Sequence, residues 1–131
     1  MQLPPFTSRT DSFRDRPFMP PEEVLRGIPA LYATEDVLVE QKLVHAHYFI
    51  PSQQLPFDWF VMELSPEQNY TAFGFVCLQG DTANAEFGYF ALWELADIFL
   101  APGHPAVIRN EELTQATPWA QVRQEWGRKF A

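Results

Sequence analysis

Residues 57–79 read FDWFVMELSPEQNYTAFGFVCLQ, and they set the fold class expected of this 131-residue chain. Two apolar runs, Phe57–Leu64 and Tyr70–Gln79, are rich in aromatic and branched side chains, which is typical of strands. The segment SPEQN between them has the residue types of a turn. Strands joined by so short a connection pair antiparallel, so the sequence predicts an antiparallel sheet built around this hairpin.

One further strand is expected on each side of the hairpin. Side chains alternate with a period of two along Lys42–Ile50, and another strand is expected over Glu86–Leu92. Consecutive strands with short connections favour a meander. The predicted fold is therefore α+β: a single antiparallel sheet of about four strands in a meander, with short helices packed on one face.

Short helices and a separate N-terminal arm complete the expected organisation. One helix begins at Pro21 and ends at Gly27, a second covers Leu92–Leu100, and a third begins at Thr117. After Gly27 the chain turns into extended structure, where Leu31 and Tyr32 are expected to pack into the core. Residues 1–20 contain four prolines and no hydrophobic period, so an extended or flexible arm is expected there. Residues 21–131 are expected to form a single α+β domain with a C-terminal helix.

Cysteine usage and hydropathy indicate the compartment. Cys77 is the sole cysteine, so no internal disulfide is possible and nothing indicates an oxidising environment. The N-terminal segment does not have the pattern of a signal peptide, and no window approaches the roughly 18 apolar residues of a membrane helix. A cytoplasmic protein without membrane contact is expected.

Negative charge is concentrated in the middle of the chain. The formal net charge is −8, but residues 21–120 hold 14 acidic and 3 basic residues, a local net charge of −11. Such a body repels phosphates, so no direct binding to nucleic acid is expected. It suits a protein partner with a basic surface. Solubility alone is the alternative explanation of this charge.

Signatures of catalysis are absent from the sequence. It has no glycine-rich phosphate loop and no nucleophile elbow, so no catalytic residue and no cofactor is predicted, and an enzyme is not favoured. The weak metal candidates are His45 and His47, which share one face of a strand about 7 Å apart. A metal such as zinc would need further ligands, for which Asp58, Glu63 and His104 are the available side chains.

Two segments, Ile28–Asp36 and Ala85–Leu95, resemble the signatures of a bacterial family catalogued as domain of unknown function 2958 (DUF2958). Between them, Asp58–Phe60 and Phe73–Phe75 are similar to that family's tryptophan strand and to the F-G strand that follows it. The resemblance spans about residues 22–115. It implies a short protein of plasmids, integrative elements or phages, often encoded near antirestriction-type genes, and it supplies no catalytic or ligand residues.

Charge and resemblance together predict a small, acidic, non-enzymatic protein-binding accessory protein of a mobile element. Its expected role is that of an inhibitor or DNA mimic acting on a host DNA-directed defence system of the antirestriction or anti-CRISPR type, because carboxylates can imitate phosphates. Two alternatives stay open: an oligomeric or structural module with an aromatic interface, and a metal protein or enzyme centred on His45 and His47. The candidate partner-binding residues are Glu35, Asp36, Asp81, Glu86, Trp119 and Trp126.

Overall fold

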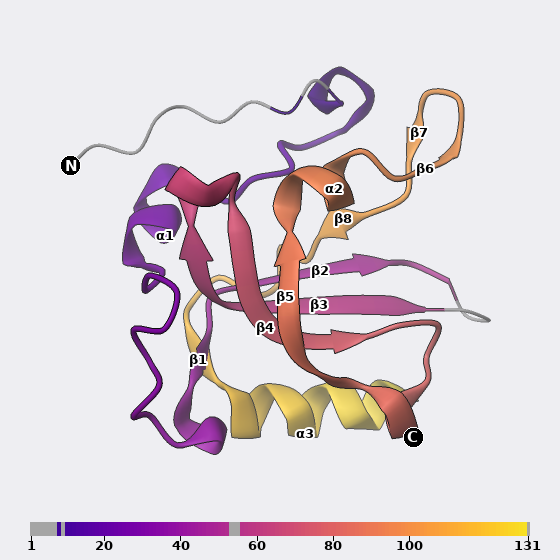
Figure 1. Cartoon of the computed structure of the whole chain (residues 1–131). Helices are drawn as coiled ribbons and strands as arrows, with labels where there is room; N and C mark the ends of the chain where they lie inside the picture. The colour runs from indigo at the N-terminus through magenta and orange to yellow at the C-terminus, as the bar shows by residue number, and fades with distance from the viewer. Residues whose placement is uncertain (1–7, 9, 53–55, 131) are drawn as a thin grey trace.

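The computed structural model describes residues 8, 10–52 and 56–130 of the chain. Its main element is a five-stranded antiparallel sheet with the strand order β5-β4-β3-β2-β8 (Figure 1). Strands β2 to β5 are each hydrogen-bonded to the next along the chain, and β8 is added beside β2. The strands are β2 (Ala46–Ile50), β3 (Phe57–Ser65), β4 (Thr71–Cys77), β5 (Glu86–Ala91) and β8 (Ile108–Arg109).

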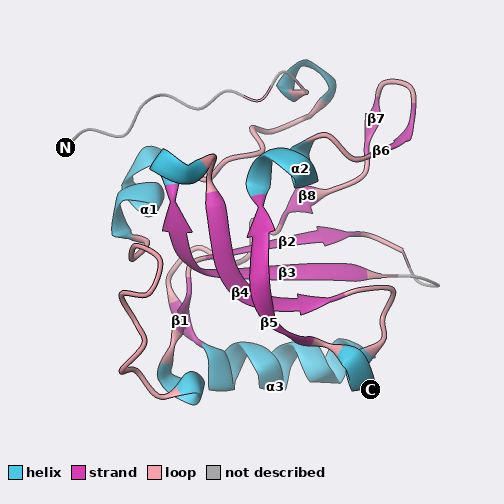
Figure 2. Cartoon of the chain, viewed as in Figure 1, coloured by secondary structure: helices cyan, strands magenta, loops and turns pink. Residues whose placement is uncertain are grey.

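Two smaller sheets and a few helices surround the main sheet, as Figure 2 shows. In the small sheets, β1 (Leu43–Val44) pairs with β9 (Thr117–Pro118), and β6 (Phe99–Ala101) pairs with β7 (His104–Pro105). The α-helices are α1 (Glu22–Gly27), α2 (Leu92–Ala96) and α3 (Trp119–Phe130). Short 3-10 turns are η1 (Asp11–Phe13), η2 (Val39–Gln41), η3 (Pro66–Gln68) and η4 (Thr82–Asn84).

The predicted fold, a single four-stranded sheet with short helices on one face, is wrong. The protein is mostly sheet, with a fifth strand in the main sheet and two additional small sheets. The helices lie on both sides: α3 packs on one face and α1 and α2 on the other (Figure 1). The strands that the prediction missed are two or three residues long, which is too short for a period of two to be recognised.

Strand β3 is the centre of the fold because both of its faces are buried. Trp59 and Val61 belong to the apolar cluster that includes residues of α1 and α2. Phe60 belongs to the opposite cluster, together with Trp119 and Val122 of α3. A strand covered on both sides needs apolar side chains at nearly every position, which explains why Trp59–Met62 is a continuous apolar run that does not alternate.

A β-bulge interrupts the pairing of β3 with β4. The register shifts between Val61 and Glu63, and Gly74 of β4 lies opposite Val61. A Cβ at Gly74 would lie 1.6 Å from the carbonyl oxygen of Phe60, so the two backbones approach as closely as only glycine allows. One buried carboxylate lies on each side of the bulge, Asp58 before it and Glu63 after it.

Residues 10–20 pack on the face that carries α1 and α2. Phe18 stacks on Tyr48 with ring centroids 4.5 Å apart, and the Tyr48 hydroxyl donates to the Phe18 carbonyl at 2.9 Å. Arg14 donates to the backbone carbonyls of Ala96 and Val107. This segment therefore closes the core on that face. The remainder of the predicted arm, residues 1–7 and 9, lies outside the described residues.

Candidate functional site

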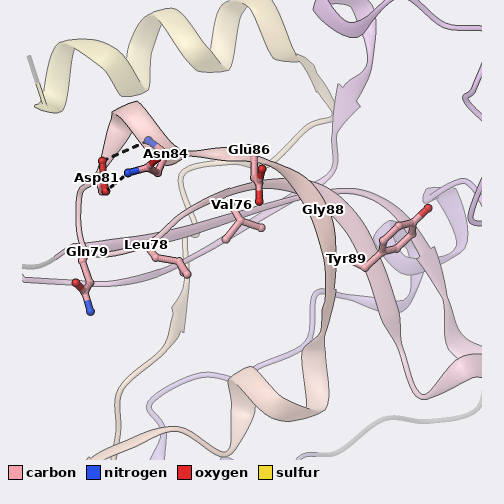
Figure 3. Close-up of a pocket in the computed structure, with 8 residues that line it drawn as sticks. All are labelled: Val76, Leu78, Gln79, Asp81, Asn84, Glu86, Gly88 and Tyr89. Carbon is pink, nitrogen blue, oxygen red and sulfur yellow. Dashed lines mark hydrogen bonds between the residues drawn. The ribbon is translucent and has the colours of Figure 1, made fainter.

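Asp81 and Glu86, two of the candidate partner-binding residues, line one shallow pocket of about 470 Å³ (Figure 3). Asp81 is turned toward Asn84: its Oδ2 accepts from Asn84 Nδ2 at 2.7 Å, and its Oδ1 accepts from the Asn84 backbone N–H at 3.3 Å. Glu86 lies on β5, which is the edge strand of the main sheet, and its side chain is exposed. Val76 and Leu78 supply apolar surface to the same pocket.

This Asp81 pocket has the chemistry of a binding surface. Its ionisable lining residues are Asp81, Glu86 and Tyr89. It combines two carboxylates with exposed apolar atoms at a sheet edge. That combination suits a basic, partly apolar surface on another protein.

The edge formed by β5 continues toward the loop that contains Glu35. Tyr89 of β5 is 53% exposed, and its ring centroid lies 6.2 Å from that of Tyr32. Hydrogen bonding to Tyr32 raises the pKa of Tyr89, and the negative charges of Glu63 and Glu35 add to this shift. Glu35 therefore lies close enough to Tyr89 to act on it electrostatically. Tyr89 and Glu86 are three positions apart on β5 and project from opposite faces, so Glu35 and Glu86 share the edge at β5 but not one face of the sheet.

Glu63 organises the loop that leads from α1 to this edge. Its carboxylate accepts from the backbone N–H of Tyr32 at 2.7 Å, from the backbone N–H of Thr34 at 3.1 Å, and from the Thr34 hydroxyl. The Lys42 ammonium donates to the carbonyl and the hydroxyl of Thr34. Tyr32 has a φ of 71° and is 60% exposed, so the expectation that Tyr32 packs into the core is wrong.

The two candidate tryptophans differ in position. Trp119 is 2% exposed and belongs to the core, where its ring packs against Phe60 and Phe75. Trp126 lies further along α3 and lines a groove. Trp119 is therefore explained by packing, which leaves Trp126 as the tryptophan of α3 that can meet a ligand.

The α3 groove, of about 1140 Å³, lies between the ends of β2 and β3, the loop at residues 110–113, and α3. Its aromatic floor contains His47 stacked on Phe60, with ring centroids 4.2 Å apart and planes at 7°. The Trp126 ring lies on the α3 side, 5.9 Å from the Phe60 ring. The carboxylates of the groove are those of Asp58, Glu111, Glu112 and Glu125.

His47, Asp58 and Asn110 form a hydrogen-bond network in this groove. His47 Nε2 lies 2.7 Å from Asp58 Oδ1, and His47 Nδ1 lies 3.2 Å from Asn110 Nδ2. Asn110 Oδ1 accepts from the backbone N–H of Glu112 at 2.9 Å, which turns its NH2 group toward His47. Because an amide NH2 can only donate, His47 Nδ1 accepts and Nε2 carries the proton. Both ring nitrogens of His47 are thus engaged within the network.

Asp58 keeps one oxygen without a hydrogen-bond partner. Its Oδ2 is buried and accepts from no described residue, whereas most buried polar atoms in proteins are paired. His47 donates a hydrogen bond to Oδ1, and no lysine or arginine among the described residues pairs with Asp58. A negative charge is therefore left beside the groove. The sequence signal for Asp58 was an acid inside an apolar strand, which pointed only to a metal ligand.

The two metal candidates are not brought together as a site. His45 lies between β1 and β2, where its Nε2 is buried without a partner in the described part of the chain, and burial lowers its pKa. Both nitrogens of His47 are already engaged. Within residues 8, 10–52 and 56–130, no group of three His, Cys, Asp or Glu side chains is placed to hold a metal ion.

Acidic and basic side chains differ in how the fold uses them. Every lysine and arginine side chain that the structure describes has a partner within the fold: Arg16–Glu111, Arg26–Glu22, Arg109–Glu111 and Arg123–Glu40 are ion pairs, and Arg14 and Lys42 donate to backbone carbonyls. Many exposed carboxylates have no basic partner among the same residues. They include Glu23, Glu35, Asp36, Glu67, Asp81, Glu86, Glu94 and Glu112.

No family model, curated protein or solved structure matches the chain. The resemblance to DUF2958 therefore stays a prediction. In the described part of the chain, no helix combines the length and the apolar character that a membrane crossing requires. The Asp81 pocket, the α3 groove and the distribution of charge are the features from which a function can be argued.

Proposed function

We propose that this protein is a non-enzymatic binding protein that uses carboxylates along β5 to engage a basic surface on a protein partner. The supporting observation is that its basic side chains are paired within the fold, whereas many of its exposed carboxylates are not. The described cations are held within the fold, while Glu86 of the Asp81 pocket and Glu35 beside Tyr89 have no basic partner among the described residues. Uncompensated surface charge raises association rates with an oppositely charged partner and selects against acidic ones.

The class of partner follows from the same charges. A basic protein surface commonly serves to hold nucleic acid, and carboxylates on a rigid sheet edge can compete with phosphates for it. Together with the resemblance to proteins of mobile elements, this favours an inhibitor of a DNA-directed host defence system, of the antirestriction or anti-CRISPR type. Its place of action would be the cytoplasm, where such systems meet incoming DNA.

Affinity capture with a DNA competitor tests this function. The tagged protein is incubated with lysate of a bacterium that carries restriction and CRISPR systems, at increasing salt and with or without duplex DNA. The expected result is capture of a nucleic-acid-binding protein that is displaced by the duplex and by salt, because both compete for the same basic surface.

A matched pair of variants locates the binding surface. The triple variant Glu35→Gln, Asp81→Asn, Glu86→Gln removes three charges from the β5 side, and it is expected to lose the captured protein. Another triple variant, Glu23→Gln, Glu67→Gln, Glu94→Gln, removes the same charge from α1, η3 and α2 and is expected to retain it. Equal recovery with both variants, or capture that duplex DNA leaves unchanged, would overturn the proposal.

A further inference from the structure

We infer that the α3 groove binds the side chain of an arginine on the protein partner, with the guanidinium group held against the aromatic floor beside Asp58. The inference rests on the proposed function for the source of this arginine. The groove itself is separate from the Asp81 pocket and shares no lining residue with it. Three properties of the groove lead to this ligand: its rings, its rim charges and the free oxygen of Asp58.

Aromatic rings and carboxylates in the groove attract the same kind of ligand. Phe60 is 1% exposed and lies under His47, so the aromatic surface open to a ligand comes from the partly exposed rings of His47, Phe49 and Trp126. Ring faces attract cations, most strongly where water is excluded. Glu112 and Glu125 are exposed at the groove, and no base among the described residues pairs with either carboxylate. Arg16 and Arg109 also line the groove, and both pair with Glu111, so the carboxylates left for a cation are those of Asp58, Glu112 and Glu125.

Asp58 is the second, independent reason to expect a cation. It is 3% exposed and lines the groove, and its Oδ2 has no donor among the described residues. His47 is the hydrogen-bond partner of its other oxygen, and no lysine or arginine among the described residues pairs with this carboxylate. A buried, uncompensated carboxylate is costly for the folded state. A bound cation would remove that cost, so the groove favours a positively charged ligand.

The aromatic and acidic lining of the groove favours guanidinium over ammonium. A guanidinium is planar, stacks on aromatic faces, presents five N–H donors and is weakly hydrated, whereas an ammonium is compact and strongly hydrated. The rim already accommodates such a group, because the exposed Arg16 of this chain donates to Glu111 there. Arg16 is held by Glu111, which leaves Glu112, Glu125 and Asp58 for an arginine from outside.

Titration of the full chain with single amino-acid derivatives tests the groove directly. Nα-acetyl-arginine methylamide is added at low salt to isotope-labelled protein, and NMR signals of the His47 imidazole and the Trp126 indole are followed. The citrulline derivative is the matched neutral probe, and the lysine derivative is the ammonium probe. The arginine derivative is expected to shift both signals saturably, citrulline to leave them in place, and lysine to bind more weakly.

Variants connect the binding to the proposed residues. Asp58→Asn is expected to weaken arginine binding at least about fivefold, because a charge-assisted contact is lost. Glu112→Gln at the rim is expected to weaken it less, and it keeps the test decisive should Asp58→Asn fold poorly. Glu67→Gln, an exposed charge outside the groove, is the control and should bind like the wild type.

Several outcomes would overturn the inference. These are equal shifts with arginine and citrulline, equal or stronger binding of lysine, or unchanged arginine affinity in both Asp58→Asn and Glu112→Gln. The two proposals can fail separately. Arginine binding without DNA-competed capture overturns the proposed function alone, whereas DNA-competed capture without arginine binding overturns the groove alone.

Discussion

Asp58 and Glu63 lie on the same strand, β3, and each is 3% exposed, yet the protein treats the two carboxylates differently. Glu63 accepts three hydrogen bonds, from the backbone and hydroxyl of Thr34 and from the backbone of Tyr32. Asp58 accepts one from His47, and its other oxygen has no donor among the described residues. The bulge between them separates a satisfied carboxylate from an unsatisfied one.

The different hydrogen bonding of the two carboxylates indicates a structural role for Glu63 and a ligand-binding role for Asp58. A carboxylate with several donors fixes the segment that supplies them, so Glu63 is explained by the loop at residues 30–36. A buried charge with an unpaired oxygen lowers the stability of the folded state, and no contact of Asp58 among the described residues offsets this cost. Local rules of this kind are broken most often at functional sites. Asp58 is therefore the residue of the pair to associate with a ligand.

The largest expected effect comes from disturbing the strand that carries both residues. Gly74→Ala would place a Cβ 1.6 Å from the Phe60 carbonyl oxygen, so β3 and β4 would have to separate. We expect a loss of more than about 4 kcal/mol in the free energy of unfolding, measured by urea denaturation. Gly88→Ala is the matched control. Gly88 lies opposite Gly74 on β5 and has no atom within 4 Å of an added Cβ, so similar losses in both variants would contradict this account.

Glu63→Gln should produce the next largest effect. The amide keeps one acceptor oxygen but presents an NH2 group to the N–H donors of Tyr32 and Thr34, and the charge that strengthens those bonds is lost. A loss of about 2–4 kcal/mol in the free energy of unfolding is expected. Hydrogen exchange of the Tyr32 and Thr34 amides should accelerate. Glu67→Gln, at an exposed site, should change stability by less than about 0.5 kcal/mol, and an equal loss there would refute the structural role of Glu63.

Short-range patterns in the sequence predicted the central strands, but not the contacts that distinguish Asp58 from Glu63. The apolar runs at β3 and β4 are visible because each is long and rich in aromatic residues. Asp81 and Glu86 are proposed among the acidic candidates because of the negative charge of this part of the chain, and they are five residues apart. Both side chains line one pocket because only the short turn η4 separates Asp81 from the start of β5 at Glu86.

Contacts set by the register of distant segments could not be predicted. The network of the groove joins His47, Asp58 and Asn110, and it depends on β8, whose two residues carry no periodic signal. The hydrogen-bond donors to Glu63 come from a loop about thirty residues earlier in the chain. No sequence pattern in that loop indicates that its backbone binds a buried carboxylate. Helix α3 was expected from its sequence, but nothing in a single helix shows which face of a sheet it will cover.

His45 adds a pH-dependent contribution to stability. Burial lowers the pKa of His45 below the ordinary 6.5, and its Nε2 has no partner among the described residues. As the pH falls below 6.5, the unfolded chain binds a proton at His45 before the folded chain does, so stability decreases toward the lowered folded-state pKa. Denaturation from pH 7.5 to 5 should show this loss, and His45→Gln should reduce it. An unchanged pH profile in the variant would assign the loss to other groups.

The smallest expected effect is that of Asp58→Asn on stability, and it is the most informative for the comparison. The remaining amide oxygen still accepts from His47 Nε2, and the replaced oxygen had no donor to lose. Removal of the buried charge offsets the burial of an unpaired NH2, so the free energy of unfolding should stay within about 1 kcal/mol of wild type in urea denaturation. A loss as large as that of Glu63→Gln would mean that Asp58 is also structural. Its free oxygen would then no longer indicate a ligand, whereas near-wild-type stability with weakened arginine binding would separate the two carboxylates by role.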